Sequence, residues 1–470
     1  MAAAGLLLAA AGWLAWCRVA GARPPAAWRD GRAVLGLWLL ACGLTGRPLL
    51  AGLWAGAAFA GLALADASKR RVLQEPLHAL DAALAREVLR HPHLYLPFAG
   101  LRPLLAGATG LLLGSAALLA WEPAGLGAGE RMLALLLAAA ALALPVGPGL
   151  AARLARDPAA DAARVGPATT LLAHAAIARA ERPRRRAALA PGGPPPPLSD
   201  PPPHLLLLQL ESFWDARGRT PRADAPPLPG WDALAAVARA RGRLSVPGFG
   251  ANTMRAEFAA LTGLPEAALG LDAWNPYAAF ARRPVDSLAW RLRAAGYDTL
   301  ALHPHDPRFF RRDCVLPALG FRRFEAEDAF RGAARAGRYI ADAALAERIL
   351  QHLHAARGPL FLFAISMAAH GPYAAPDPFA DWARRIARTD AMLAALAAAA
   401  PGLARPLVLL AWGDHLPSLP ETAALADRRT EWLLWHSARP GAGGWRDIAA
   451  ADIPREALAA LAAEGPAHPG

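Results

Sequence analysis

The chain has 470 residues, of which 55% are hydrophobic and only 19% are charged. Soluble domains carry about 25% charged residues, so this composition indicates a membrane segment and excludes a disordered chain. The net charge of +12 suits anionic headgroups or phosphate-bearing substrates, and we expect no nucleic-acid partner. The three cysteines are too few for a disulfide framework.

Five apolar runs precede residue 153 and predict about five transmembrane helices. A helix needs about 20 residues to cross the hydrocarbon core of a bilayer. The shortest run can span only if Arg32 and Arg47 extend to the two interfaces. The first run could instead be a cleaved signal peptide, although it lacks a basic segment in front. The runs are residues 1–17, 33–46, 48–65, 103–121 and 132–152.

A change of composition near residue 203 separates the membrane segment from the rest of the chain. We expect a transmembrane domain over residues 1–153, an amphipathic helix with a Pro/Arg-rich linker over 154–203, and a C-terminal domain over 204–470. Within the linker, residues 181–203 are rich in proline and arginine, which predicts an extended polyproline II segment.

Beyond the linker, short apolar runs alternate with longer stretches of helical period. This pattern predicts an α/β domain with a mainly parallel central sheet. Ligands bind beyond the carboxyl ends of parallel strands, and four of the runs end close to an ionisable side chain, so we expect one shared site. Those side chains are Glu211, His303, His370 and the pair Asp414-His415.

Glu211 and Asp414-His415 follow two of these apolar runs and could ligate a divalent metal ion. A carboxylate at the end of a buried strand is costly unless it is paired or bound to a cation. Carboxylate oxygens and an imidazole nitrogen suit Mn²⁺, Zn²⁺ or Mg²⁺. The alternatives are a salt bridge at Glu211 and a turn with a helix cap at Asp414.

A glycine-rich turn over residues 246–252 leads into a short helix that begins at Thr253. The helix dipole and free N–H groups at that position favour a bound phosphate. A metal on the threonine oxygen would lower the hydroxyl pKa and make it a nucleophile. The alternative is an ordinary N-cap.

Four motifs in this order resemble those of sulfatase-like membrane transferases of the alkaline phosphatase superfamily. The nearest members are lipoteichoic acid synthases and the phosphoglycerol transferases of periplasmic glucans. The resemblance covers the membrane spans, the linker and an α/β catalytic domain. The motifs are Leu-Glu-Ser-Phe-Trp-Asp at 210–215, Gly-Ala-Asn-Thr-Met-Arg-Ala-Glu-Phe at 250–258, Met-Ala-Ala-His-Gly-Pro-Tyr at 367–373 and Gly-Asp-His-Leu-Pro at 413–417.

The resemblance implies a role for each candidate residue. Thr253 would be the nucleophile, and Arg312 would hold the substrate phosphate. The cofactor would be one divalent metal ion, with Mn²⁺ favoured and Zn²⁺ or Mg²⁺ as alternatives. The implied metal ligands are Glu211, Thr253, Asp414 and His415, and the implied substrate-binding residues are Arg312, His370 and Phe310. Apart from the resemblance, His303 could be a further metal ligand, but a histidine in a His-Pro-His loop is more often a substrate contact or a plain surface residue, and we expect a substrate contact.

The resemblance also implies a reaction. A phosphoglycerol headgroup would pass from phosphatidylglycerol in the membrane to a glycan or glycerol-phosphate acceptor through a phospho-threonine intermediate. The alternatives are a phosphoethanolamine transferase, a phosphodiesterase or sulfatase-type hydrolase, and an inactive membrane scaffold. Thr253 cannot give the formylglycine of true sulfatases, and Cys314 alone cannot form the disulfides typical of phosphoethanolamine transferases. The oligomeric state stays open.

Two observations disagree about orientation. Basic residues after the third and fifth runs, such as Lys69, Arg70 and Arg153, would lie in the cytoplasm by the positive-inside tendency. The resemblance implies a multi-pass protein of the bacterial inner (cytoplasmic) membrane whose catalytic domain faces the periplasm or exterior, because the lipid donor is in the outer leaflet. We expect the second arrangement.

Overall fold

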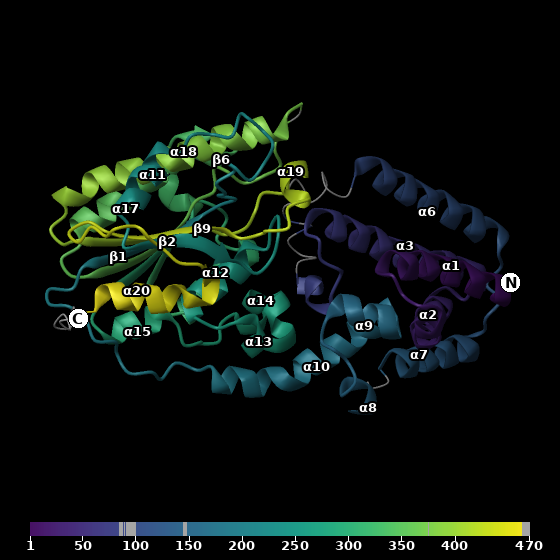
Figure 1. The fold of residues 1–470 in the computed structure, drawn as a ribbon. Helices are drawn as coiled ribbons and strands as arrows, with labels where there is room; N and C mark the ends of the chain where they lie inside the picture. The colour runs from purple at the N-terminus through teal and green to yellow at the C-terminus, as the bar shows by residue number, and fades with distance from the viewer. Residues whose placement is uncertain (84–87, 89, 91–99, 144–147, 375, 463–470) are drawn as a thin grey trace. The chain divides into compact units, whose positions relative to one another are not determined.

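The computed structural model describes residues 1–83, 88, 90, 100–143, 148–374 and 376–462 (Figure 1). The chain divides into two compact units, Met1–Arg182 and Pro183–Gly470. In the described residues, the first unit is helical and the second is an α/β domain around a nine-stranded sheet.

Apolar helices form the N-terminal unit, and α1 packs closely against α3 through glycines. A Cβ atom on Gly12 would lie 2.1 Å from the carbonyl oxygen of Gly56, and one on Gly52 would lie 2.1 Å from that of Gly5. Small residues at a membrane helix contact allow the two backbones to approach in this way. The helices are α1 (Ala2–Ala20), α2 (Pro24–Thr45), α3 (Pro48–Val72), η1 (Ala79–Ala83), α6 (Leu101–Trp121), α7 (Ala128–Ala143), α8 (Pro148–Ala151) and α9 (Pro158–Val165).

Three helices within the described residues are long and apolar enough to cross a membrane, whereas the sequence predicted about five. They are α1, α3 and residues 102–121 of α6. Charged residues near the start of α2 lower its apolar character. Helix α7 has 16 residues, which gives a length of about 24 Å and falls short of the hydrocarbon core. Residues 144–147 of the fifth predicted run lie outside the described residues.

The segment that leads into the second unit is more helical than predicted. Helix α10 (Pro167–Ala188) continues through Pro183, so the expectation of an extended segment is wrong for residues 181–188. A proline inside a helix removes one backbone hydrogen bond. Nε of Arg186 donates to the carbonyl oxygen of Ala279 at 2.8 Å, and this bond holds the last helical turn.

The central sheet of the second unit is mixed but mainly parallel, as the sequence predicted. Its strand order is β10-β2-β9-β8-β1-β7-β3-β4, with β11 paired to β2. Strands β8, β1, β7, β3 and β4 run parallel, and β9 runs antiparallel to both β8 and β2. The strands are β1 (His204–Leu210), β2 (Ala240–Ser245), β3 (Asp298–Leu302), β4 (Arg323–Glu325), β7 (Leu360–Ile365), β8 (Leu407–Gly413), β9 (Thr430–His436), β10 (Gly444–Trp445) and β11 (Ile448–Ala449), and β5 (Arg335–Ala336) pairs separately with β6 (Tyr339–Ile340).

Helices cover both faces of this sheet and bury it completely at its centre (Figure 1). Successive side chains of a strand point to opposite faces. Accordingly, Leu206 and Leu208 join the core beneath α11, α17 and α18, while Leu205 and Leu207 join the core beneath α12, α15 and α20. The helices are α11 (Pro229–Ala236), α12 (Thr253–Thr262), α13 (Glu266–Leu269), α14 (Pro276–Phe280), α15 (Leu288–Ala294), α16 (Arg312–Ala318), α17 (Asp342–Ala355), α18 (Pro378–Ala399), α19 (Pro420–Ala423) and α20 (Ile453–Leu461).

Candidate metal centre

The predicted site residues follow four neighbouring parallel strands. Glu211 comes directly after β1, His303 directly after β3, and Asp414 directly after β8, while His370 lies in the loop that follows β7. Because β8, β1, β7 and β3 are adjacent and parallel, their carboxyl ends lie along one edge of the sheet.

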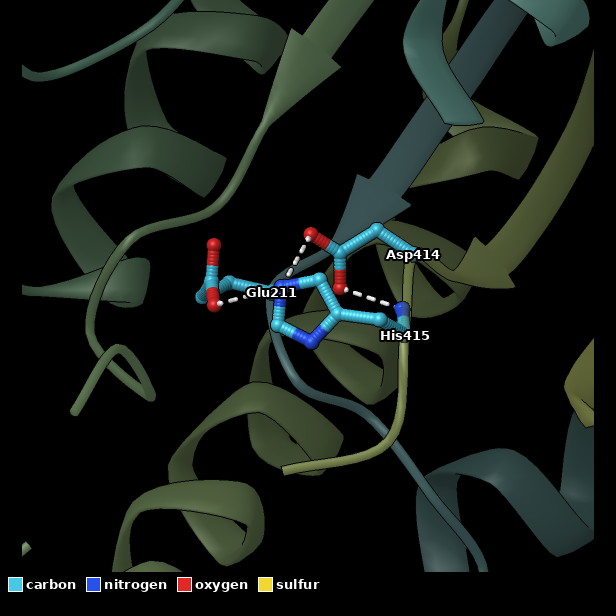
Figure 2. A group of neighbouring side chains, drawn as sticks. All are labelled: Glu211, Asp414 and His415. Atoms are coloured by element: carbon cyan, nitrogen blue, oxygen red, sulfur yellow. Dashed lines mark hydrogen bonds and ion pairs between the residues drawn. The ribbon is translucent and has the colours of Figure 1, made fainter. Parts of the chain in front are cut away.

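Glu211, Asp414 and His415 form a buried cluster at this edge (Figure 2). One potential ligand atom of each residue lies within 4.8 Å of those of the other two. Nε2 of His415 is 3.6 Å from Oε1 of Glu211 and 3.4 Å from Oδ2 of Asp414. Figure 2 shows that both carboxylates are directed toward this ring nitrogen.

Hydrogen bonds from the backbone hold the cluster in place. Oδ1 of Asp414 accepts from the N–H groups of Ser212, at 2.8 Å, and His415, at 2.9 Å. Nδ1 of His415 lies 3.0 Å from the carbonyl oxygen of Leu416. A carbonyl can only accept, so Nδ1 carries a hydrogen, and Nε2, which faces the carboxylates, is the ring nitrogen left to bind a metal ion. Oγ of Ser212 donates to Oε1 of Glu211 at 2.8 Å.

These residues fit a divalent metal ion. Oδ2 of Asp414 is buried and has no hydrogen-bond partner in the described part of the chain. A buried carboxylate oxygen that faces a nitrogen lone pair is costly without a cation or a proton between them. Two carboxylates and one imidazole supply ligands for a single divalent ion, and this donor set does not select Mn²⁺ over Zn²⁺ or Mg²⁺.

The electrostatics of the cluster agree with this assignment. Burial and the neighbouring charge of Glu211 raise the pKa of Asp414 to about 7. Burial lowers the pKa of His415, but the carboxylates of Asp414 and Glu211 outweigh it and the net shift is upward. The cluster therefore retains protons when no other positive charge is present, and metal binding there would displace them.

Thr253 lies beside this cluster. It is the first residue of α12, as the sequence predicted, and its side chain is buried. Its Oγ1 atom is 3.4 Å from Nε2 of His415. Asn252, just before it, has a φ angle of +66°, a left-handed conformation that asparagine tolerates better than most residues. This turn places the hydroxyl of Thr253 next to the metal-binding set.

Arg312 is buried at the start of α16 and is engaged by other side chains. Its Nε donates to Oε2 of Glu257 at 3.1 Å, and its Nη2 donates to Oε1 of the same carboxylate. Its Nη1 lies 3.2 Å from Nε2 of His303. Glu257, which lies one helical turn after Thr253, was not predicted from the sequence. The available signal was its spacing of four residues from Thr253, which places both on one face of α12.

The structure places the two remaining candidates in different surroundings. The ring centroid of Phe310 is 5.3 Å from Cζ of Arg312, so this aromatic side chain packs near the guanidinium. Nδ1 of His370 lies 3.2 Å from the hydroxyl of Tyr339, and its backbone carbonyl accepts from Arg385 at 2.6 Å. His370 is thus held by contacts with Tyr339 and Arg385, and no distance places it at the metal-binding set.

The second unit is thus a mixed, mainly parallel α/β domain with a cluster of possible metal ligands at one edge of its sheet. The sulfatase family model matches residues 203–442, which is just over half of the chain. The chain therefore belongs to the sulfatase family, and the family and fold expected from the four motifs are confirmed.

The chain is similar to two curated proteins and to a solved structure, among others. The capsular polysaccharide biosynthesis protein RkpI of Rhizobium meliloti (strain 1021) is 34% identical over 241 residues, which are 49% of this chain and 44% of that protein. A protein of the same organism named for cyclic β-1,2-glucan modification is 30% identical over 233 residues, 46% of this chain and 36% of that protein. The chain thus spans less than half of the length of both. The lipoteichoic acid synthase LtaP from Listeria monocytogenes has a TM-score of 0.47 at 18% identity, with 61% of this chain and 78% of that chain covered.

Proposed function

We propose that this protein transfers a phosphoglycerol-type headgroup from a membrane phospholipid to a cell-envelope glycan or glycerol-phosphate acceptor. The observation that carries the proposal is the distance of 3.4 Å between Oγ1 of Thr253 and Nε2 of His415. It supports the proposal because the hydroxyl of Thr253 then lies beside three side chains that could hold a metal ion and at a helix N-terminus, where a phosphate is also favoured.

Thr253 performs a two-step exchange in this proposal. Its Oγ1 bonds to the phosphorus, the bond from phosphorus to the diacylglycerol oxygen breaks, and the hydroxyl proton ends on diacylglycerol. An acceptor hydroxyl then bonds to the same phosphorus, and its proton returns to Thr253 as the threonine ester breaks. A divalent ion held by Glu211, Asp414, His415 and Thr253 would lower the hydroxyl pKa and neutralise phosphoryl charge.

The rest of the chain supports a lipid donor and a glycan acceptor. Three helices able to cross a membrane precede the domain and would keep it close to a lipid donor. The two Rhizobium meliloti relatives are named for a capsular polysaccharide and a cyclic glucan, which supports a glycan acceptor. The order of the four motifs supports phosphoglycerol as the transferred group. The protein would be a multi-pass inner-membrane enzyme whose catalytic unit faces outward.

Headgroup release tests this proposal. Purified full-length protein receives vesicles with labelled phosphatidylglycerol or labelled phosphatidylethanolamine, in the presence of Mn²⁺. We expect diacylglycerol from phosphatidylglycerol alone. Release from phosphatidylethanolamine alone would assign a phosphoethanolamine transferase, and release of glycerol phosphate to water at the same rate with and without glycan would assign a phosphodiesterase.

A further inference from the structure

We propose that Glu257 and His303 are positioning residues that orient Arg312 toward the phosphate of the donor headgroup. The inference rests on the proposed function, because it assigns the phosphate to that reaction. It also changes the expected role of His303, which was predicted from the sequence to contact the substrate directly.

The guanidinium of Arg312 has five N–H groups in a fixed plane. Glu257 accepts one from Nε and one from Nη2, and His303 faces one on Nη1. One N–H therefore remains on each of the two terminal nitrogens. N–H groups on the two terminal nitrogens of a guanidinium can bind a phosphate in a bidentate manner.

Glu257 is held as firmly as the arginine that it orients. The hydroxyl of Tyr277 donates to its Oε2 at 2.6 Å, and Nε2 of Gln209 donates to its Oε1 at 3.4 Å. Burial and the charge of Glu257 raise the pKa of Tyr277 well above its usual range, so the phenol stays a donor. The side chains of Glu257, Tyr277, Gln209 and Arg312 are all buried, and each oxygen of the Glu257 carboxylate receives two hydrogen bonds. Glu257 is therefore fixed before any substrate arrives.

The imidazole of His303 is fixed as an acceptor. An arginine N–H can only donate, so Nε2 of His303 accepts from Arg312. Nδ1 then carries the hydrogen and faces the carbonyl oxygen of Ile365 at 3.5 Å. Both ring nitrogens thus have protein partners, and the ring acts on the substrate through Arg312.

This arrangement links the nucleophile to the phosphate-binding group. Glu257 lies four residues after Thr253, so both side chains leave the same face of α12 one turn apart. Through its two bonds to Arg312, Glu257 fixes the free N–H pair relative to the hydroxyl of Thr253. Misplacement of a reacting group by about 1 Å can lower a rate about 100-fold.

The test measures binding of inorganic phosphate to the full-length protein by calorimetry, with Mn²⁺ present. The variants are Arg312→Lys, Glu257→Gln, the double variant, and Tyr277→Phe, which keeps the Glu257 charge and removes one of its donors. The matched control is Glu431→Gln, because Glu431 is another buried glutamate paired with an arginine, Arg219, at 2.7 Å.

We expect Arg312→Lys and Glu257→Gln each to weaken phosphate binding about tenfold, the loss of one charge-assisted interaction. The double variant should bind no more weakly than Arg312→Lys, because Glu257 acts through Arg312. Tyr277→Phe should weaken binding about threefold, and this milder variant decides the matter if Glu257→Gln does not fold. Glu431→Gln should bind as the unaltered protein does. In turnover of phosphatidylglycerol vesicles, kcat should fall more than KM rises.

Three results would overturn the inference. They are additive losses in the double variant, wild-type phosphate affinity in both Glu257→Gln and Tyr277→Phe, and wild-type affinity in Arg312→Lys. Absence of phosphate binding by the unaltered protein would overturn it as well. Failure of the proposed function is distinct, since phosphate would then bind with the expected dependence on Arg312 and Glu257 while phosphatidylglycerol stays intact.

Discussion

The hydroxyl oxygen of Thr253 lies 3.4 Å from Nε2 of His415, although 162 positions separate the two residues. His415 lies two residues after the end of β8, and Thr253 is the first residue of α12, directly after the glycine-rich turn. This contact brings a hydroxyl to the only cluster of three or more His, Cys, Asp or Glu side chains suited to a metal ion among the described residues.

Replacement of Thr253 should therefore abolish activity without lowering the stability of the fold. Thr253→Ala should lower kcat at least about 1,000-fold, because the other catalytic groups contribute little to the rate once the nucleophile is removed. The thermal unfolding temperature should change little, since Asn252 and not Thr253 is the N-cap residue of α12. Thr253→Ser keeps a hydroxyl and should retain part of the activity. Turnover in the alanine variant near that of the serine variant would contradict the assignment.

Metal content gives an independent check on the cluster. We expect about one divalent ion per chain by elemental analysis after dialysis against the metal. Asp414→Asn should lose most of it, because Asp414 supplies a buried oxygen that has no hydrogen-bond partner in the described residues. A metal at 100 times its Kd stabilises the folded state by about 2.7 kcal/mol, so EDTA should lower the unfolding temperature. An equal metal content in Asp414→Asn would show that the ion binds elsewhere.

The glycine contact between α1 and α3 makes a prediction about the membrane unit alone. Gly12→Val should destabilise it by about 1–3 kcal/mol, because the new side chain would overlap the backbone of Gly56. Gly110→Val is the matched control, since a Cβ on Gly110 has no atom within 4 Å. Thermal unfolding in detergent compares the two, and equal stabilities would mean that α1 and α3 do not pack in this way.

Orientation can be predicted despite the basic residues near the ends of the spans. Three and five are both odd, so either number of spans puts the two ends of the membrane domain on opposite sides of the membrane. With the catalytic unit outside, an alkaline phosphatase fused after Gly470 should be active. A fluorescent protein that matures only in the cytoplasm should stay dark at the same position. The opposite pair of results would place the catalytic unit in the cytoplasm, as the positive-inside tendency suggests.

Local pattern was enough to predict four strands of the central sheet, β1, β3, β7 and β8, and the residues that follow them. Glu211 and Asp414 stand out because each follows a mostly apolar run of strand length, and the carboxyl ends of parallel strands lie at one edge of a sheet. The pairing of Arg312 with Glu257 was missed because it joins residues 55 positions apart through tertiary packing. The helical state of residues 181–188 was missed for the same reason, since the bond from Arg186 to Ala279 lies outside any local pattern.

Mass spectrometry of Thr253 shows whether this residue is the nucleophile. The full-length protein is incubated with phosphatidylglycerol vesicles and Mn²⁺ without an acceptor, and the peptide that contains Thr253 is then analysed. We predict a phosphoglycerol ester on Thr253 that appears together with diacylglycerol and disappears when the acceptor is added. Release of diacylglycerol while Thr253 stays unmodified, with the ester absent at every time point, would contradict the account.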